Sequence, residues 1–135
     1  MSEENAETVR ALIELWNVGN RRVELFSEHC DPAIELEGPL SSVVGEPYRG
    51  YAGIERWERD LDQQFAEWRI SIDDLRQVGN QVIAFVTVNA RGRTSNIALH
   101  FASASVVQFG SDHRVTRIRI YPNVTDALKA VGLED

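Results

Sequence analysis

The sequence predicts an α+β domain in which helices pack on one face of an antiparallel sheet. The chain has 135 residues, of which 43% are hydrophobic, and helical spacing in its first half gives way to strand-like runs in its second. A chain of this length and apolar content can close one core without metals or disulfides. We therefore expect a single domain over residues 1–135.

Four segments are expected to be helical. Apolar residues recur every three or four positions over residues 4–17 and again over residues 51–65, which is the spacing of one helix face. A shorter helix is expected over residues 22–28, and Pro32 ends that run because the residue before a proline avoids the α region. A last helix over residues 126–131 would begin after Thr125 as N-cap and end at Gly132.

The remaining segments alternate as strands do. A first strand over residues 33–37 ends at Gly38-Pro39, and a short strand is expected near Tyr48. After the long helix in the sequence, runs of β-branched residues are separated by turns about every ten to fifteen residues. This arrangement predicts an antiparallel meander of four strands, over residues 68–78, 82–89, 96–109 and 115–121.

Alternation along the last two strands separates a face toward the helices from an outer face. Ile118 and Ile120 are the apolar set of the last strand, and Phe101 shares its side of the preceding strand with Ser103 and Ser105. The opposite side carries small and polar residues, which suit either solvent or a contact between two sheets. We expect a homodimer through this outer face, formed by His100, Ala102, Ala104, Arg117, Arg119 and Tyr121.

Charge and motif content exclude several function classes. With 14 basic and 21 acidic residues the net charge is −7, which argues against nucleic acids and anionic membranes as partners. Cys30 is the only cysteine, the three histidines do not form a converging ligand set, and no nucleotide-binding or acyl-transfer motif occurs. We expect no metal and no cofactor. Without a long apolar run or a signal-like start, we expect a cytoplasmic protein.

Two segments carry a family resemblance. The order of elements, together with Tyr48–Trp57 at the start of the long helix and Ala127–Leu133 at the end, resembles the SnoaL-like branch of the nuclear transport factor 2-like superfamily. Ketosteroid isomerases, polyketide cyclases and limonene epoxide hydrolases belong to that superfamily. The resemblance implies a cone-shaped, strongly curved sheet with three helices in the N-terminal half, which enclose an apolar pocket open at one end. It also implies a dimer through the outer sheet face.

The resemblance to the isomerases implies a general base at the end of the first strand, where Glu37 stands. This carboxylate would be surrounded by the apolar side chains of Trp57, Phe101 and Ile118. The alternative is that Glu37 faces water and that the apolar residues of this strand point inward. The isomerases' two oxyanion donors correspond to Leu12 and Ser105, so one donor is absent and the other is weaker.

We expect the pocket to bind a small apolar molecule. The candidate ligand-binding residues are Leu12, Trp16, Trp57, Phe101, Ser103, Ser105, Ile118 and Ile120. The two serines either bind a ligand carbonyl or bond to backbone and water, and the two tryptophans either contact a ligand or pack in the core. Three hypotheses follow: a cofactor-independent isomerase, cyclase or hydrolase that uses Glu37, a non-catalytic ligand-binding or accessory module, and a dimerisation domain.

Overall fold

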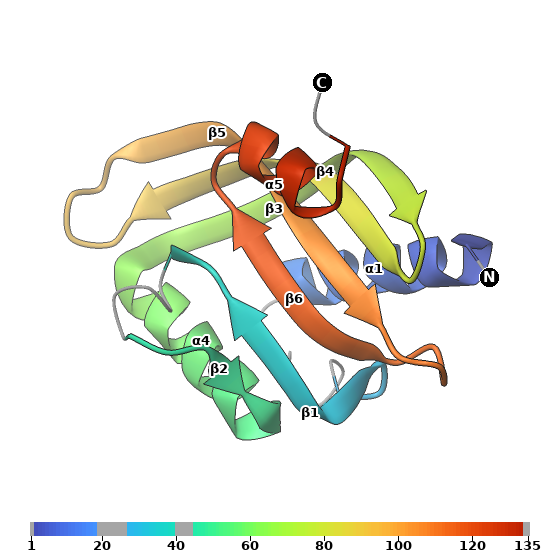
Figure 1. The fold of residues 1–135 in the computed structure, drawn as a ribbon. Helices are drawn as coiled ribbons and strands as arrows, with labels where there is room; N and C mark the ends of the chain where they lie inside the picture. Colours follow the sequence, from blue (N-terminus) through green and yellow to red (C-terminus); the bar gives the residue numbers. More distant parts are fainter. Residues whose placement is uncertain (1, 19–26, 40–44, 134–135) are drawn as a thin grey trace.

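The computed structural model describes residues 2–18, 27–39 and 45–133. The described elements in chain order are α1 (Ser2–Val18), β1 (Cys30–Glu37), β2 (Tyr48–Arg49), α4 (Gly50–Gln64), β3 (Phe65–Val78), β4 (Gln81–Gly92), β5 (Ala98–Phe109), β6 (Val115–Tyr121) and α5 (Val124–Ala130) (Figure 1). The helix expected over residues 22–28 falls largely outside the described residues, and residues 27–29 form a turn. No described helix is long and apolar enough to cross a membrane.

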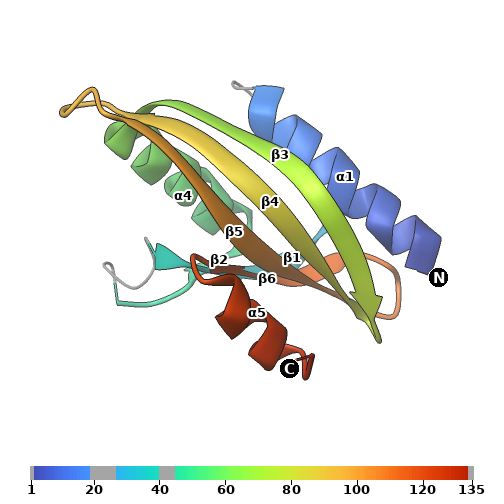
Figure 2. The same ribbon diagram turned by 90° about the horizontal axis from the view of Figure 1, so that it is seen from above.

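The six strands form one open sheet in the order β2-β1-β6-β5-β4-β3. The predicted meander is confirmed, because β3 to β6 pair in sequence and every pairing among them is antiparallel. The first strand differs from expectation: β1 runs parallel to β6, with Leu36 opposite Ile118 and Glu37 opposite Arg119. The sheet is therefore mixed rather than wholly antiparallel, and β3 to β5 bend strongly along their length (Figure 2).

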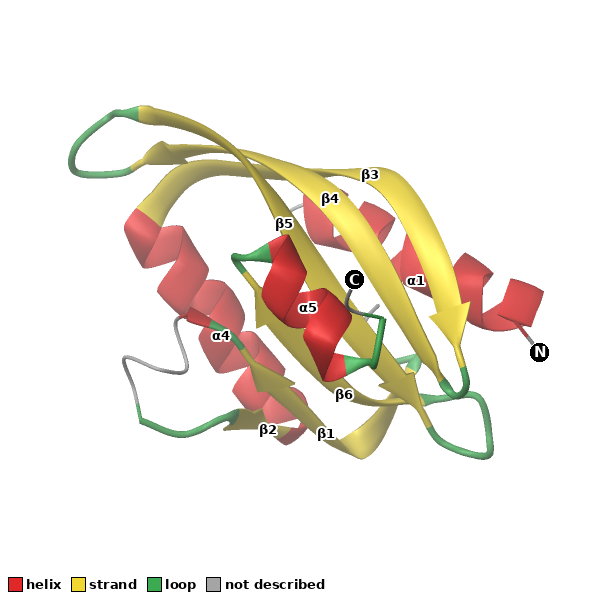
Figure 3. Ribbon diagram, turned by 45° about the horizontal axis from the view of Figure 1, so that its top comes forward, coloured by secondary structure: helices red, strands yellow, loops and turns green. Residues whose placement is uncertain are grey.

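The helices lie on both faces of the sheet. Helices α1 and α4 pack on one side, where α1 contacts β3 and β4 while α4 contacts β1, β2 and β3. Helix α5 lies on the other side, against β5 and β6 (Figure 3). Of the three helices expected in the N-terminal half, α1 and α4 are described and the one over residues 22–28 lies largely outside the described residues. The third described helix, α5, covers the outer face.

The end of α1 is fixed to the edge strand β3 by one amide side chain. Asn17 donates from Nδ2 to the carbonyl oxygen of Ile70 at 2.8 Å, and its Oδ1 accepts from the Ile70 backbone N–H at 2.9 Å. The side chain thereby satisfies the two backbone groups that an adjacent strand would otherwise bind. This contact fixes the C-terminal end of α1 to β3.

Glycine at position 53 allows α4 to approach β2 closely. A Cβ at Gly53 would come within 2.8 Å of the Tyr48 carbonyl carbon, so any side chain would push the helix away. The close approach brings the buried Tyr48 hydroxyl to 2.6 Å from Oδ2 of Asp60. The buried face of α4 consists of Ile54, Trp57 and Leu61, whose spacing is that of the predicted helix.

A second, smaller core lies beneath α5. Ile83, Ala104 and Val106 of the outer sheet face are buried against Ala127 of α5. Ala104 is therefore not a surface residue, which corrects its placement in an outer-face dimer contact. Of the other residues expected there, His100 and Ala102 are exposed, and Arg117, Arg119 and Tyr121 are partly buried. The homodimer itself stays a prediction.

The ends of α5 differ slightly from expectation. Asn123, not Thr125, is the N-cap: its side chain accepts a hydrogen bond from the Thr125 backbone N–H at 2.8 Å. At the other end Gly132 has a φ of +79°, and the Leu133 N–H returns to the Leu128 carbonyl at 2.8 Å. The predicted glycine at the C-terminus of this helix thus has the left-handed conformation that such helix ends favour.

Candidate functional site

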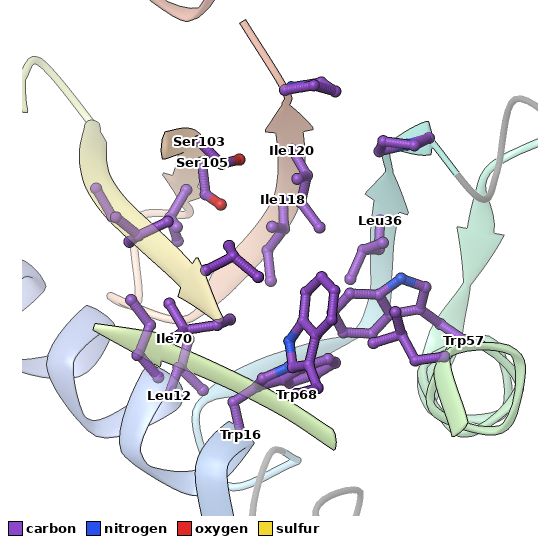
Figure 4. Close-up of a pocket in the computed structure, with 18 of the residues that line it drawn as sticks. Leu12, Trp16, Leu36, Trp57, Trp68, Ile70, Ser103, Ser105, Ile118 and Ile120 are labelled. Carbon is purple, nitrogen blue, oxygen red and sulfur yellow. The ribbon is translucent and has the colours of Figure 1, made fainter. Parts of the chain in front are cut away.

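An apolar cavity of about 290 Å³ lies between α1, α4 and the inner face of the sheet (Figure 4). All eight residues expected to line a pocket do line it: Leu12, Trp16, Trp57, Phe101, Ser103, Ser105, Ile118 and Ile120. They come from two helices and two strands, because the apolar faces of α1 and α4 and the inward-facing residues of β5 and β6 surround the same space. Whether they contact a ligand stays a prediction.

Sequence reasoning missed the wall contributed by β3 and β4. Trp68 and Ile70 of β3 line the cavity, as do Ala84, Val86 and Val88 of β4. The signal was present in the sequence, since each of these strands carries apolar residues at every second position. Applying to β3 and β4 the alternation that identified Ser103 and Ser105 would have found them.

All three tryptophans of the chain line this cavity. The rings of Trp16 from α1 and Trp57 from α4 lie with centroids 3.7 Å apart and planes inclined by 37°. Trp68 enters from β3, and its ring lies 5.0 Å from that of Phe65. Indole rings joining both helices to the sheet provide large flat surfaces on which a planar ligand can stack.

The lining contains few polar atoms, and only some of them have a hydrogen-bond partner among the described residues. The Ser103 hydroxyl donates to the Tyr121 carbonyl oxygen at 3.0 Å, which fastens the end of β6 to β5. The Ser105 hydroxyl has no hydrogen-bond partner among the described residues, and Nε1 of Trp68 is buried without one. Ser103 thus has a structural partner, whereas the Ser105 hydroxyl and the buried Trp68 N–H have none among the described residues.

The described lining contains no ionisable side chain. Its members are aliphatic, aromatic, proline and serine residues. General acid or base catalysis requires a titratable group within hydrogen-bond reach of the reacting atom. The described lining offers only hydroxyl and indole groups for that task.

Glu37 does not line this cavity, which is the alternative that the sequence left open. Its neighbours Ile34 and Leu36 are buried on the inner side of β1, so alternation turns the Glu37 carboxylate to the outer face. There its Oε1 accepts hydrogen bonds from Nε and Nη2 of Arg117. Glu37 and Arg117 line an adjacent open cleft with Arg119 and Tyr121. The carboxylate is therefore not part of the described lining of the cavity.

Two buried titratable groups lie elsewhere in the fold. Burial raises the pKa of the Cys30 thiol to about 12, against a smaller opposing effect of Arg114. Burial, and then the hydrogen bond and charge of Asp60, raise the pKa of Tyr48 to about 12. Both groups stay protonated near neutral pH, so neither supplies a nucleophile or a base.

The histidines are scattered through the described structure. Nδ1 of His100 lies 2.6 Å from Oδ1 of Asn89, and His113 occupies a turn with a φ of +63°. Within the described ranges, His, Cys, Asp and Glu side chains form no group of three or more that could hold a metal ion.

Comparisons with known proteins give both a family and a fold. The sequence profile of the SnoaL-like domain matches residues 9–118. No curated protein matches the chain. Among solved structures, an NTF2-like protein of unknown function from Burkholderia pseudomallei is similar at 15% identity and a TM-score of 0.77, over 95% of this chain and 97% of that one.

Two further structures are similar over nearly their whole lengths. A candidate SnoaL-like polyketide cyclase from Jannaschia sp. has 13% identity and a TM-score of 0.78, over 98% of this chain and 94% of that one. TerC, co-crystallised with polyporic acid, has 17% identity and a TM-score of 0.77, over 95% of this chain and 97% of that one. At such identities the likeness concerns the fold, whereas the profile match spans most of the sequence. By that match, this chain belongs to the SnoaL-like family.

Proposed function

We propose that this protein binds a neutral, apolar, ring-containing small molecule in its cavity and does not transfer protons with the side chains that line it. The observation that carries the proposal is the absence of ionisable side chains from the described lining. A desolvated apolar site disfavours charged ligands, because nothing there replaces their hydration. The site therefore selects for neutral molecules.

The size and shape of the cavity support a ligand of one or two rings. Its volume of about 290 Å³ exceeds that of the engineered apolar cavities of about 150 Å³ that take up benzene. It lies at the lower end of the ligand pockets, about 300–1,000 Å³, that hold drug-sized molecules. The indole rings of Trp16, Trp57 and Trp68 supply stacking surfaces for such a ligand.

Ser105 supplies the polar contact that would orient the ligand. Its hydroxyl donates a hydrogen bond, which favours a ligand with an acceptor such as a carbonyl oxygen. Among the similar structures, TerC was co-crystallised with polyporic acid, a small organic compound.

Catalysis of the isomerase, cyclase or hydrolase type is not favoured by the described site. Each of those reactions moves a proton at the substrate, and such steps use a positioned titratable group. Glu37, the carboxylate expected there, is paired with Arg117 on the other face of the sheet. The non-catalytic binding module is thus the hypothesis that the geometry supports best.

A titration with three matched bicyclic probes tests the proposal. We would follow tryptophan fluorescence while adding 1-indanone, indane or indane-1-carboxylate at neutral pH. All three tryptophans line the cavity, so an occupied cavity changes the emission directly. We expect saturable binding of the ketone, weaker binding of the hydrocarbon, and no binding of the anion.

The proposed binding of a neutral molecule would be contradicted by two results. One is the absence of saturable binding for both neutral probes. The other is preferential binding of the carboxylate, which would require a cationic group in the site. If the protein catalysed the incorporation of solvent deuterium at the carbon next to the carbonyl of 1-indanone, the enzyme hypothesis would be supported instead.

A further inference from the structure

The large hydrophobic side chains that are exposed in the described structure gather at the beginning of β5 and on the residue just before it. They are Ile97, Leu99 and Phe101, with exposed fractions of 59%, 40% and 37%. Leu99 and Phe101 alternate along β5 with the cavity residue Ser103, so they share its side of the sheet. Ile97 precedes the strand at the same spacing. We call these three residues the hairpin strip.

The hairpin strip is continuous with the cavity. Phe101 belongs to both, and it lies opposite Val88 of β4, which also lines the cavity. The next row outward contains Leu99 opposite Ala90, and Ala90 in turn lies opposite Trp68 of β3. Apolar cross-strand rows therefore lead from the cavity onto the projecting end of the β4–β5 hairpin (Figure 1).

The projecting hairpin is held in place rather than loose. Arg93 at its tip donates from Nε to the Asp62 carbonyl oxygen at 2.6 Å and from Nη2 to the Phe65 carbonyl oxygen at 3.2 Å. Its backbone N–H donates to the Gln64 carbonyl oxygen at 2.9 Å. These carbonyls lie at the C-terminus of α4, where acceptors lack helical partners and a cation is favourable. The strip is thus a fixed surface.

The size of the hairpin strip argues for a small occupant. A standard protein interface buries roughly 800 Å² on each partner, which is more than three side chains of this size expose. On the opposite face of β5 lie the small residue Ala98 and also His100, whose Nδ1 is hydrogen-bonded to Asn89 of β4. Only the side that faces the mouth of the cavity is apolar.

We propose that the hairpin strip receives an apolar chain attached to the ring that occupies the cavity, so that the ligand class is an elongated aryl or acyl compound rather than a compact ring. This inference rests on the proposed function. The five residues from Ile97 to Phe101 are separated by four steps of about 3.3 Å and so span about 13 Å, which sets the reach of the chain. Apolar contact with exposed side chains becomes favourable once the chain covers them.

A pair of probes that differ only in chain length tests the inference. We would measure the dissociation constants of 4′-methylacetophenone and 4′-heptylacetophenone by tryptophan fluorescence, with wild type and the variants Leu99→Asp and Ala98→Asp. A fully buried methylene changes affinity by roughly fourfold. We expect Leu99→Asp to weaken the heptyl compound at least tenfold and to leave the methyl compound within twofold.

Ala98→Asp is the matched control, because it adds the same charge to the neighbouring exposed position on the other side of the strand. It should leave both dissociation constants within twofold. Equal weakening of both probes by Leu99→Asp, or no weakening of either, would overturn the inference while the proposed function stands. If neither probe bound to the wild type, the inference and the proposed function would both be overturned. A wild-type dimer that Leu99→Asp converts to a monomer, with unchanged heptyl binding, would assign the strip to a second copy instead.

Discussion

Glu37 and Arg117 form an ion pair on the face of the sheet that points away from the cavity. Oε1 of Glu37 lies 3.0 Å from Nε of Arg117, and the Nη2 group donates to the same oxygen. The Arg117 and Glu37 side chains retain 39% and 34% of their exposure, so solvent screens much of their attraction. The relationship assigns the carboxylate to the surface of the sheet rather than to a reaction in the cavity.

Replacing Glu37 by Gln should therefore affect neither ligand binding nor the fold strongly. We expect the dissociation constant of 1-indanone to stay within twofold, and the free energy of unfolding to fall by at most about 1 kcal/mol, as for other solvent-exposed pairs. Fluorescence titration and urea denaturation measure the two quantities. Loss of 1-indanone binding with an intact fold would show that the carboxylate reaches the cavity after all.

Ser105 and Ser103 should respond differently to truncation. Because the Ser105 hydroxyl has no described partner, Ser105→Ala should keep the stability of the fold and weaken 1-indanone binding by roughly two- to tenfold, the effect of one lost hydrogen bond. Indane binding should not change. Ser103→Ala loses its bond to the Tyr121 carbonyl and should cost about 1 kcal/mol of stability. The reverse pattern in thermal unfolding and titration would mean that the two serines have exchanged roles.

Strand alternation predicted the part of the candidate site that β5 and β6 contribute, and it left the orientation of the first strand open. Along β5 and β6 the inward sets that contain Ser105 and Ile118 were identified correctly because the antiparallel meander and its turn positions fix their register. Over residues 33–37 the choice between Glu37 and Leu36 was left to the family resemblance. The burial of Leu36 shows that the apolar pattern of the segment itself was the better guide.

The position of α5 could not be predicted from the sequence. Its range and its glycine end were expected, but a helix of seven residues shows an apolar face without showing which side of a sheet that face covers. Placing α5 on the outer face buries Ala104 and Val106 and thereby removes part of the surface expected for a dimer. The parallel pairing of β1 with β6 was not predicted either, because it joins two strands that are far apart in the sequence.

Substitution of Ala104 should act on the fold rather than on an interface. Ala104 is fully buried against α5, so Ala104→Glu places an unpaired charge in a core and should cost about 3 kcal/mol or more. Ala102→Glu on the same strand face is exposed and should change stability by less than about 0.5 kcal/mol. Urea denaturation compares the two. Similar, small effects would mean that α5 does not cover Ala104 in solution.

The alkaline limit of stability should depend on Tyr48. Its folded pKa of about 12 lies above its ordinary value of 10.0, so the folded state holds the proton more tightly than the unfolded chain. The resulting stability is fully present below pH 10 and is lost as the pH rises toward 12. Tyr48→Phe should lower stability at pH 8 through loss of the bond to Asp60 and should flatten this alkaline decline. An unchanged pH profile of the melting temperature in the variant would contradict the assignment.

Filling the cavity tests most directly whether it is the ligand site. Val86 lines the cavity from the middle of β4, and Val86→Phe would place a ring inside a space of about 290 Å³ at a cost to stability of up to about 3 kcal/mol. Phe85→Tyr, at the neighbouring position on the other face of β4, serves as the control. The measurement is the dissociation constant of 1-indanone from the tryptophan emission. We predict saturable binding to wild type and to Phe85→Tyr, and at least tenfold weaker binding to a folded Val86→Phe. Equal binding to all three proteins would contradict the account.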